Sequence, residues 1–413
     1  MEGELKSTYC FKNTEHQATQ TFSSSSPGTC FFGEQRFGAA ASNPRTPRPH
    51  HYEPGTAVGQ TSRLSCDGAS SFFFVEAQHE QPPISLIRQD MEVNLGGIPF
   101  DLDFHPSEQL VAAGLIDGNL LLYRYSPNAL PQRLLKVRAH SESCRAVRFI
   151  NDGRAILTGS PDHSILATDV ETGSVIARLE DAHDDAVNRL VNVTSETIAS
   201  GDDNGCIKVW DTRQRSCCNS FEAHEDYISD MTYSSDSMKL LATSGDGTLS
   251  VCNLRRNKVH ARSEFSEVEL LSVVIMKNGR KVICGSQTGT LLLYSWGCFK
   301  DCSDRFVDLS QNPVNALLKL DEDRVVAASE SGLISLVGVL PNRIIQPIAE
   351  HSDYPVERLA FSHDKKYLGS ISHDYMLKLW DMDLLQSSEN VSNGPAVVAA
   401  GASASDNLFA FMD

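Results

Sequence analysis

A 13-residue pattern occurs seven times between positions 111 and 380 of this 413-residue chain. Each copy runs from an apolar stretch through a turn rich in Gly, Asp or Ser into a second apolar stretch. The copies are VAAGLIDGNLLLY, ILTGSPDHSILAT, IASGDDNGCIKVW, LLATSGDGTLSVC, VICGSQTGTLLLY, VVAASESGLISLV and LGSISHDYMLKLW. They end at positions 123, 168, 210, 252, 294, 337 and 380, so successive spacings are 45, 42, 42, 42, 43 and 43 residues.

This spacing predicts a closed ring of small β-sheets. Apolar and β-branched residues on both sides of a tight turn favour two antiparallel strands. One four-stranded sheet of this size cannot bury both of its faces, so the copies must pack around a common axis. The repeat length lies in the range of about 40–45 residues that is typical of propeller blades. We therefore expect an all-β fold, a seven-bladed β-propeller over residues 91–383.

The two ends of the chain lack this pattern. Residues 1–90 are rich in Ser, Thr, Pro and Gly, so we expect a disordered extension, and the sequence leaves open whether it is expressed. Residues 384–413 contain no Lys or Arg and are expected to form a flexible tail. Whether the apolar stretch NLFAFMD near position 413 is a docking peptide is also left open.

Composition excludes several functional classes. No apolar run approaches the length of about 18 residues that spans a bilayer, and MEGELKSTYC is unlike a signal peptide, so we expect an intracellular protein without membrane contact. The net charge is −17, which disfavours direct binding of duplex nucleic acid. The 11 Cys residues show no paired metal-ligand spacing, so neither a metal, nor a cofactor, nor a disulfide framework is expected.

Histidines precede four of the repeats at equivalent positions. They are His140, His183, His224 and His351. In the last repeat we predict a structural hydrogen-bond network of a histidine before the blade, a serine on its second strand, an aspartate in the turn and a tryptophan on its third strand. These residues are His351, Ser370, Asp374 and Trp380. Buried polar groups need such partners, and nothing in the sequence indicates an oxyanion hole, so we expect a protein that is not an enzyme.

The third repeat is expected to have an imperfect version of this network. Its turn position holds Asn204 where the last repeat has an aspartate, and Asp203 lies one place early.

Acidic residues gather in the loops around the third and fourth repeats. In a propeller, the loops before each first strand share one face with the turns between second and third strands. The residues are Asp184, Asp185, Asp202, Asp203, Glu225, Asp226 and Asp246. One interpretation is a surface that attracts a Lys/Arg-rich protein client. The other is a solvated acidic rim that serves solubility.

Arg213 follows the third repeat in the stretch IASGDDNGCIKVWDTR. We expect it in a loop on the opposite face, where the repeat itself demands no guanidinium. Arginine offers a planar set of donors and is enriched at interface hot spots. Asp211, two residues earlier, could orient it. Trp210 and Asp211 themselves are explained most simply as scaffold, because the Trp-Asp dipeptide occurs in repeats of many functions.

The same stretch resembles the box shared by WD-repeat receptors that dock on damaged-DNA-binding protein 1, the adaptor of cullin-4 ubiquitin ligases. The resemblance assigns adaptor contact to Ile198, Asp202, Asp203, Trp210, Asp211 and Arg213. The fourth repeat has a degenerate echo, VCNLR, that ends in Arg255. The last repeat has Asp383 in place of the arginine and departs from the box.

The chain as a whole resembles the WD repeat-containing protein 55 family, particularly its plant form. The segments that carry this resemblance are DFHPSEQLVAAGLIDGNLLLYRY, AHSESCRAVRF, ETIASGDDNGCIKVWDTR and GSISHDYMLKLWDM. It implies a nuclear, often nucleolar, interaction protein with two proposed roles. One is substrate reception for a cullin-4 ligase, and the other is ribosomal RNA processing and ribosome production in support of growth and development. The tail lacks the basic residues common in nucleolar members, which weighs against strict nucleolar residence, and a cytoplasmic pool stays open.

Overall fold

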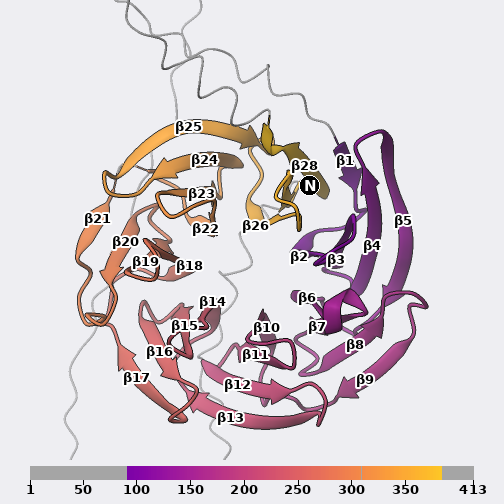
Figure 1. The fold of residues 1–413 in the computed structure, drawn as a ribbon, viewed down its shortest axis with the longest axis horizontal. Helices are drawn as coiled ribbons and strands as arrows, with labels where there is room; N and C mark the ends of the chain where they lie inside the picture. Colours follow the sequence, from indigo (N-terminus) through magenta and orange to yellow (C-terminus); the bar gives the residue numbers. More distant parts are fainter. Residues whose placement is uncertain (1–90, 308, 384–413) are drawn as a thin grey trace, which may run out of the picture. The chain divides into compact units, whose positions relative to one another are not determined.

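The computed structural model describes residues 91–307 and 309–383. Within them the chain forms seven four-stranded antiparallel sheets arranged around an axis, which confirms the seven-bladed propeller (Figure 1). The predictions of a disordered extension over residues 1–90 and a flexible tail over residues 384–413 lie outside the described residues.

The strands follow one another around the ring in chain order. They are β1 (Met91–Asn94), β2 (Pro99–Phe104), β3 (Leu110–Leu115), β4 (Asn119–Ser126), β5 (Ala129–Arg138), β6 (Ala146–Ile150), β7 (Ala155–Gly159), β8 (Ile165–Asp169), β9 (Val175–Leu179), β10 (Val187–Asn192), β11 (Thr197–Asp202), β12 (Cys206–Asp211), β13 (Ser216–Glu222), β14 (Ile228–Ser234), β15 (Lys239–Ser244), β16 (Leu249–Asn253), β17 (Lys258–Arg262), β18 (Leu270–Met276), β19 (Lys281–Ser286), β20 (Leu291–Ser295), β21 (Asp304–Phe306), β22 (Val314–Lys319), β23 (Arg324–Ser329), β24 (Leu333–Gly338), β25 (Arg343–Glu350), β26 (Val356–Phe361), β27 (Tyr367–Ser372) and β28 (Met376–Asp381). A 3-10 turn, η3 (Asn151–Gly153), joins β6 to β7.

Blades 1 to 6 each consist of four consecutive strands, from β2–β5 in blade 1 to β22–β25 in blade 6. Blade 7 is different, because its outermost strand comes from the opposite end of the propeller sequence. Strand β1 pairs with β28 in antiparallel register, and Met91 faces Leu379. In Figure 1 the indigo β1 therefore lies beside the yellow β28, and this pairing closes the ring.

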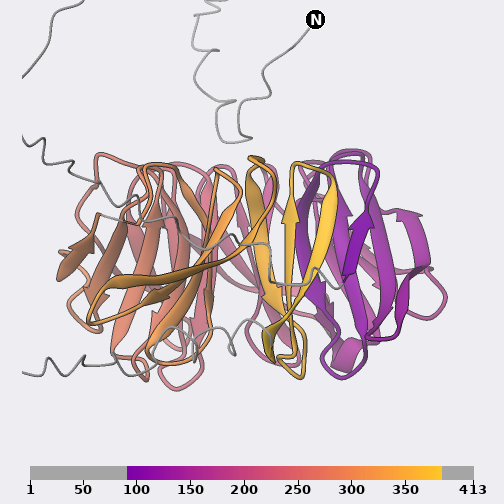
Figure 2. The same ribbon diagram turned by 90° about the horizontal axis from the view of Figure 1, so that it is seen from above.

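Burial follows the position of each strand within its blade. The middle strands β11 and β12 are almost entirely buried, whereas the outer strand β13 is mostly exposed. Apolar side chains from adjacent blades meet in shared clusters; Ile207 of blade 3, for example, packs with Ile228 and Leu240 of blade 4. Blade-to-blade packing therefore supplies the core, as the repeat predicted. The sheets stand side by side when the ring is viewed from its edge (Figure 2).

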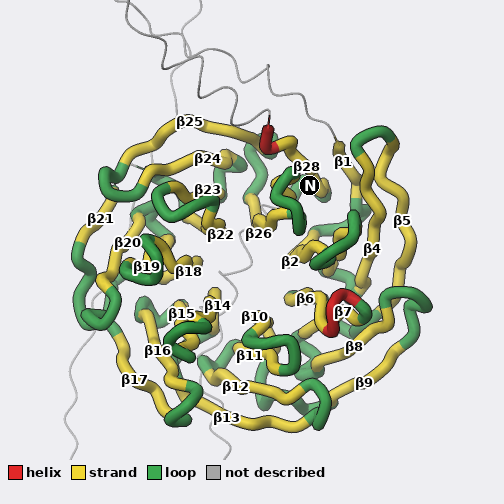
Figure 3. Tube along the Cα trace, in the orientation of Figure 1, coloured by secondary structure: helices red, strands yellow, loops and turns green. Residues whose placement is uncertain are grey.

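Two opposite faces carry the connections between strands, which Figure 3 shows in green. One face carries the loops that lead into the first strand of each blade and the turns between the second and third strands. We call it the entry face. The exit face carries the turns that join first to second and third to fourth strands. Gly205 shows how tightly the entry face is packed, since its φ is +80° and a Cβ there would lie 2.4 Å from the carbonyl oxygen of His224.

Candidate functional site

The network predicted for blade 7 is present. The indole Nε1 of Trp380 donates to Ser370 Oγ at 2.9 Å, and Ser370 Oγ lies 2.7 Å from His351 Nε2. His351 Nδ1 lies 2.8 Å from the carboxylate of Asp374. Burial lowers the pKa of His351, so the imidazole stays neutral and uses one nitrogen as a donor and the other as an acceptor.

The same network is complete in blade 3, so the prediction of an imperfect one was wrong. His183 Nδ1 lies 2.7 Å from Asp202, His183 Nε2 lies 2.6 Å from Ser200 Oγ, and Trp210 donates to Ser200 at 2.7 Å. The acid is Asp202, at the end of β11, instead of a residue at the turn position. Its second oxygen accepts the backbone N–H groups of Asn204 and Cys206, so a carboxylate from an earlier position satisfies the turn equally well.

Blades 2 and 4 contain partial versions. His140 contacts Asp162 and Thr158, but position 168 is a threonine where blades 3 and 7 have tryptophan. His224 contacts Asp246, and in blade 4 the serine position is occupied by Ala242. His224 Nε2 is therefore a buried nitrogen without a hydrogen-bond partner among the described residues. The network is thus complete in blades 3 and 7, lacks the tryptophan in blade 2, and lacks the serine hydroxyl in blade 4.

The Ser370, His351 and Asp374 contacts have the spacing of a hydrolase triad, but the serine is inaccessible. Ser370 and His351 are both 0% exposed, and the serine oxygen already accepts a hydrogen bond from Trp380. A nucleophile must reach a substrate carbonyl beside oxyanion donors, which this enclosed serine does not do. The arrangement is structural.

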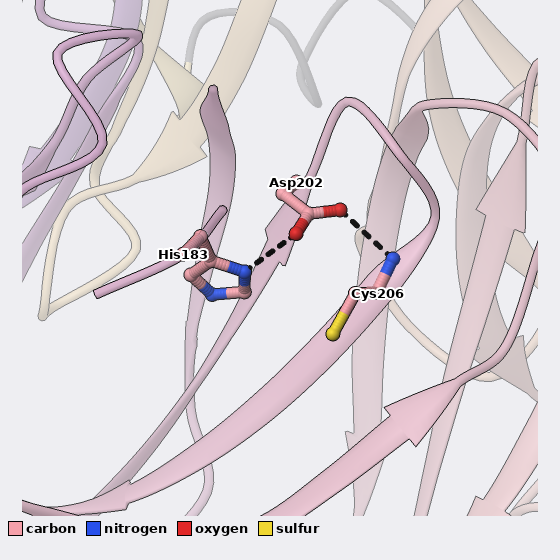
Figure 4. Close-up of side chains that lie close together, drawn as sticks. All are labelled: His183, Asp202 and Cys206. Carbon is pink, nitrogen blue, oxygen red and sulfur yellow. Dashed lines mark hydrogen bonds and ion pairs between the residues drawn. The ribbon is translucent and has the colours of Figure 1, made fainter. Parts of the chain in front are cut away.

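A similar consideration applies to three potential metal ligands in blade 3. His183, Asp202 and Cys206 bring one ligand atom each to within 4.8 Å of one another (Figure 4). Both nitrogens of His183 are occupied by the network, and burial raises the pKa of the Cys206 thiol to about 11. Because a metal needs the thiolate and an open lone pair, these residues fit a hydrogen-bonded turn better than a metal centre.

The acidic cluster on the entry face is less open than the sequence suggested. Asp202 is 2% exposed, and Asp246 is bonded to His224, so both belong to the networks instead of a solvent-facing surface. Asp203 accepts hydrogen bonds from Arg145 and Asn188. The remaining predicted residues, Asp184, Asp185, Glu225 and Asp226, are exposed or half-buried. Four of the seven predicted carboxylates thus lie outside these contacts, and binding of a basic client stays a prediction.

Three of these four carboxylates have local contacts. Asp185 and Asp226 accept the N–H of the next residue, and Glu225 lies 4.0 Å from the guanidinium of Arg262. The guanidinium of Arg262 therefore offsets part of the acidic charge of this face.

Arg213 lies where the sequence placed it, in the exit-face turn after β12, and its side chain is 63% exposed. Asp211 orients the turn, since its Oδ1 accepts the backbone N–H groups of Arg213 and Gln214. The guanidinium lies 2.9 Å from Glu196 and 3.6 Å from the second oxygen of Asp211. Of the six residues of the box, Ile198, Asp202, Trp210 and Asp211 are buried, and Asp202 and Asp203 lie at the opposite face. Arg213 is the residue of the box whose side chain is exposed at the exit face.

Sequence reasoning missed a groove beside Arg213. It has a volume of about 260 Å³ and lies between blades 2 and 3, with a mainly apolar lining that includes Ile150, Ile176, Trp210, Arg213 and Arg215. The small pair Ala167 and Ala177, which face each other across β8 and β9, leaves this space. Only the strand register reveals the pairing, so the sequence carried no direct signal for it.

The central channel contains a larger cavity of about 760 Å³ toward the exit face. Arg358 of blade 7 reaches Ser229 O and Asp230 of blade 4, and Arg189 of blade 3 donates to the same carbonyl. Arg358 thus connects blades 7 and 4 across the axis, and Arg189 connects the neighbouring blades 3 and 4. Both acidic and basic side chains line this cavity, and Asp101 and Asp103 lie beside Arg148. The contacts of these charged side chains connect one blade to another.

The part of the chain that matches known sequences coincides with the ring. The WDR55 family profile matches residues 90–385. The chain belongs to the WDR55 family. WD repeat-containing protein 55 of Arabidopsis thaliana is 69% identical over 310 residues, which cover 75% of this chain and 88% of the relative. The family is one of WD-repeat propellers, which are typically non-catalytic scaffolds.

More distant members of the WDR55 family match the same region. The Dictyostelium discoideum homolog is 38% identical over 307 residues, covering 74% of this chain and 72% of the relative. The Bos taurus protein is 40% identical over 286 residues, covering 69% and 75%. Among the described residues, no helix is long and apolar enough to cross a bilayer.

Proposed function

We propose that this WDR55-family protein is a non-catalytic nuclear scaffold in ribosomal RNA processing and ribosome production. Its membership of the family, over the whole ring from residue 90 to residue 385, carries the proposal. The buried networks support the non-catalytic part, because the described Ser-His-Asp contacts are enclosed and bonded to tryptophan. A rigid ring with two loop-bearing faces suits the holding together of several assembly factors.

Co-sedimentation of the tagged full-length chain tests this proposal. The chain should migrate with large preribosomal particles in a sucrose gradient, and its depletion should cause precursor ribosomal RNA to accumulate. Fluorescence microscopy of the same tagged chain should place it in the nucleus. A chain that stays at the top of the gradient, with unchanged precursor RNA after depletion, would argue against the proposal.

A second candidate function is docking on the cullin-4 adaptor, damaged-DNA-binding protein 1, with this chain as the receptor that presents a protein client. Its support is the exposed guanidinium of Arg213, which Asp211 holds at the exit face. Ubiquitin transfer would be carried out by the ligase, and this protein would supply proximity.

A pull-down of the adaptor by the full-length chain tests docking. Truncation of a desolvated interface arginine that pairs with a carboxylate costs on the order of 2–5 kcal/mol, enough to abolish a micromolar contact. Arg213→Ala should therefore lose the adaptor while remaining folded by circular dichroism. Arg255→Ala is the matched control, because Arg255 is exposed in the equivalent turn of blade 4. Native protein that never retains the adaptor would remove this candidate and leave the ribosomal role untouched.

A further inference from the structure

The groove between blades 2 and 3 is an unfilled part of the blade interface. In blade 1 the equivalent cross-strand pair is Leu122 and Leu135, whereas blade 2 has Ala167 and Ala177. The missing side-chain volume exposes the edge of the apolar cluster that contains Trp210. Ile176, on the outer strand β9, is 45% exposed at its border. An apolar surface of this kind is stabilised when another apolar side chain covers it.

Two arginines lie at the mouth of this groove. Arg213 and Arg215 are both exposed, and both line it together with Thr212. For Arg215 the structure gives no ion pair within residues 91–307 and 309–383. The groove therefore combines an apolar floor with two guanidinium groups at its edge, of which that of Arg213 also lies 2.9 Å from Glu196 and 3.6 Å from Asp211. Its volume of about 260 Å³ is below the range of about 300–1,000 Å³ usual for small-molecule sites, and suits anchoring side chains of a peptide.

The chain itself contains a segment with the complementary pattern. Positions 406–413 read DNLFAFMD, with five consecutive apolar residues between an asparagine and an aspartate, and Asp406 at the start. Residues 384–413 contain no Lys or Arg that would oppose the two arginines. An aromatic anchor flanked by carboxylates matches an apolar groove flanked by guanidinium groups.

The segment can reach the groove. Strand β28 runs in the same direction as β12, so the chain leaves the propeller after Asp383 on the exit face, where Arg213 also lies. A compact domain of this size has a radius of gyration of about 19 Å. The 22 residues from 384 to 405 extend to about 70 Å, more than enough to reach any part of that face.

We propose that the segment 406–413 docks in the groove between blades 2 and 3, with Phe409 or Phe411 on the apolar floor and Asp406 and Asp413 near Arg213 and Arg215. Docking there covers Arg213 at the edge of the groove. The proposal does not depend on the ribosomal role.

Competition with a labelled peptide tests the proposal on the full-length chain. The probe is a fluorescent peptide of residues 405–413, SDNLFAFMD, followed by fluorescence polarisation. The tethered segment has an effective concentration of about 1 mM, so with an intrinsic dissociation constant of about 100 μM it weakens probe binding about tenfold. A chain with Phe409→Ser and Phe411→Ser should therefore bind the probe about tenfold more tightly than the native chain.

Variants of the groove locate the binding. In the Phe409→Ser, Phe411→Ser background, Ala177→Leu fills the groove and should abolish probe binding. Ala261→Leu is the matched control, because Ala261 faces Val251 at the equivalent position of blade 4, and it should leave binding unchanged. Arg213→Glu with Arg215→Glu should also remove binding.

Charge exchange separates docking from a folding defect. A probe in which both aspartates are replaced by lysine should bind the double-glutamate chain and fail to bind the arginine-containing chain. The proposal is overturned if the probe binds native and tail-substituted chains equally, if it binds neither, or if Ala177→Leu has no effect. It is likewise overturned if Ala177→Leu disrupts only an adaptor contact, since the groove would then belong to a partner.

Discussion

Blades 3 and 7 differ from blades 5 and 6 in how they hold the turn between their second and third strands. In blade 7, His351 reaches Asp374 across 23 positions of sequence. In blade 5, Ser286 bonds within the turn to Thr288 and Thr290, and in blade 6 Ser329 does the same with Ser331 and Leu333. The backbone turn is thus compatible with either solution.

The ring of blades and the buried histidine network therefore contribute separately to the fold. All seven blades are four-stranded antiparallel sheets with apolar side chains packed between them, whereas the histidine network is complete only in blades 3 and 7 among the described sheets. Blade 7 contains the pairing that closes the ring, and blade 3 carries the exposed Arg213. We therefore expect substitutions to have much larger effects in these two blades than at equivalent turns elsewhere.

The largest effect is expected for Asp202→Ala in blade 3. It leaves His183 Nδ1 and the backbone N–H groups of Asn204 and Cys206 without their acceptor. Each buried polar group without a partner costs roughly 1–3 kcal/mol, and local rearrangement recovers part of this cost. We therefore expect a loss of about 3 kcal/mol in the free energy of unfolding. Urea denaturation followed by circular dichroism measures it. The control, Asp184→Ala on the exposed loop, should change stability by less than about 0.5 kcal/mol.

Trp380→Phe should have the next largest effect. It removes the hydrogen bond to Ser370 and part of a buried ring, so we expect a loss of about 2 kcal/mol. Trp296→Phe in blade 5 is the comparison, since Trp296 is only partly buried and lies outside any histidine network. Equal shifts of the urea midpoint for the two variants would contradict a special role for the network.

A third substitution should stabilise the protein. Ala242→Ser in blade 4 places a hydroxyl where blades 3 and 7 have serine, next to the unpartnered Nε2 of His224. A satisfied buried hydrogen bond contributes about 1 kcal/mol to stability. Serine is close to alanine in size, so the substitution changes little else at this position. An increased unfolding midpoint measures the gain, whereas a decrease would mean that the hydroxyl does not reach the imidazole.

The smallest effect is expected for Arg213→Ala. Its guanidinium is 63% exposed and its short ion pair with Glu196 lies in solvent, where such pairs contribute about 0–1 kcal/mol, so thermal and urea unfolding should remain nearly unchanged. Stability and partner binding should therefore separate at this residue. A large loss of stability would instead make Arg213 a scaffold residue like Asp211.

The repeat was enough to predict seven blades, because apolar spacing and turn residues are local signals that every copy repeats. The network of blade 3 was misjudged because alignment places Asn204 at the acid position. A carboxylate needs only to reach the histidine, and Asp202 reaches it from two positions earlier in the chain. Position in an aligned repeat is thus a weaker guide than the three-dimensional reach of the side chain.

The surfaces were harder to predict for a related reason. The sequence marks which residues are charged, but the pairing of Asp203 with Arg145 depends on how neighbouring blades meet. The groove beside Arg213 arises from two alanines, Ala167 and Ala177, that are ten positions apart and become neighbours only through the register of β8 and β9. Strand β1 was likewise outside the 13-residue pattern, because four residues are too few to show a period.

Closure of the ring by β1 has a consequence for synthesis of the protein. Met91 and Leu379 pair although they are 288 positions apart (379 minus 91). Joining ends this far apart costs about 5 kcal/mol of chain entropy by the logarithmic loop-closure relation. At about 5–20 residues per second, β28 emerges from the ribosome roughly 15–60 seconds after β1. During that interval Met91 and Val93, both buried in the finished ring, have no strand to pair with, so a nascent chain of this protein should be a client of chaperones until its last blade is made.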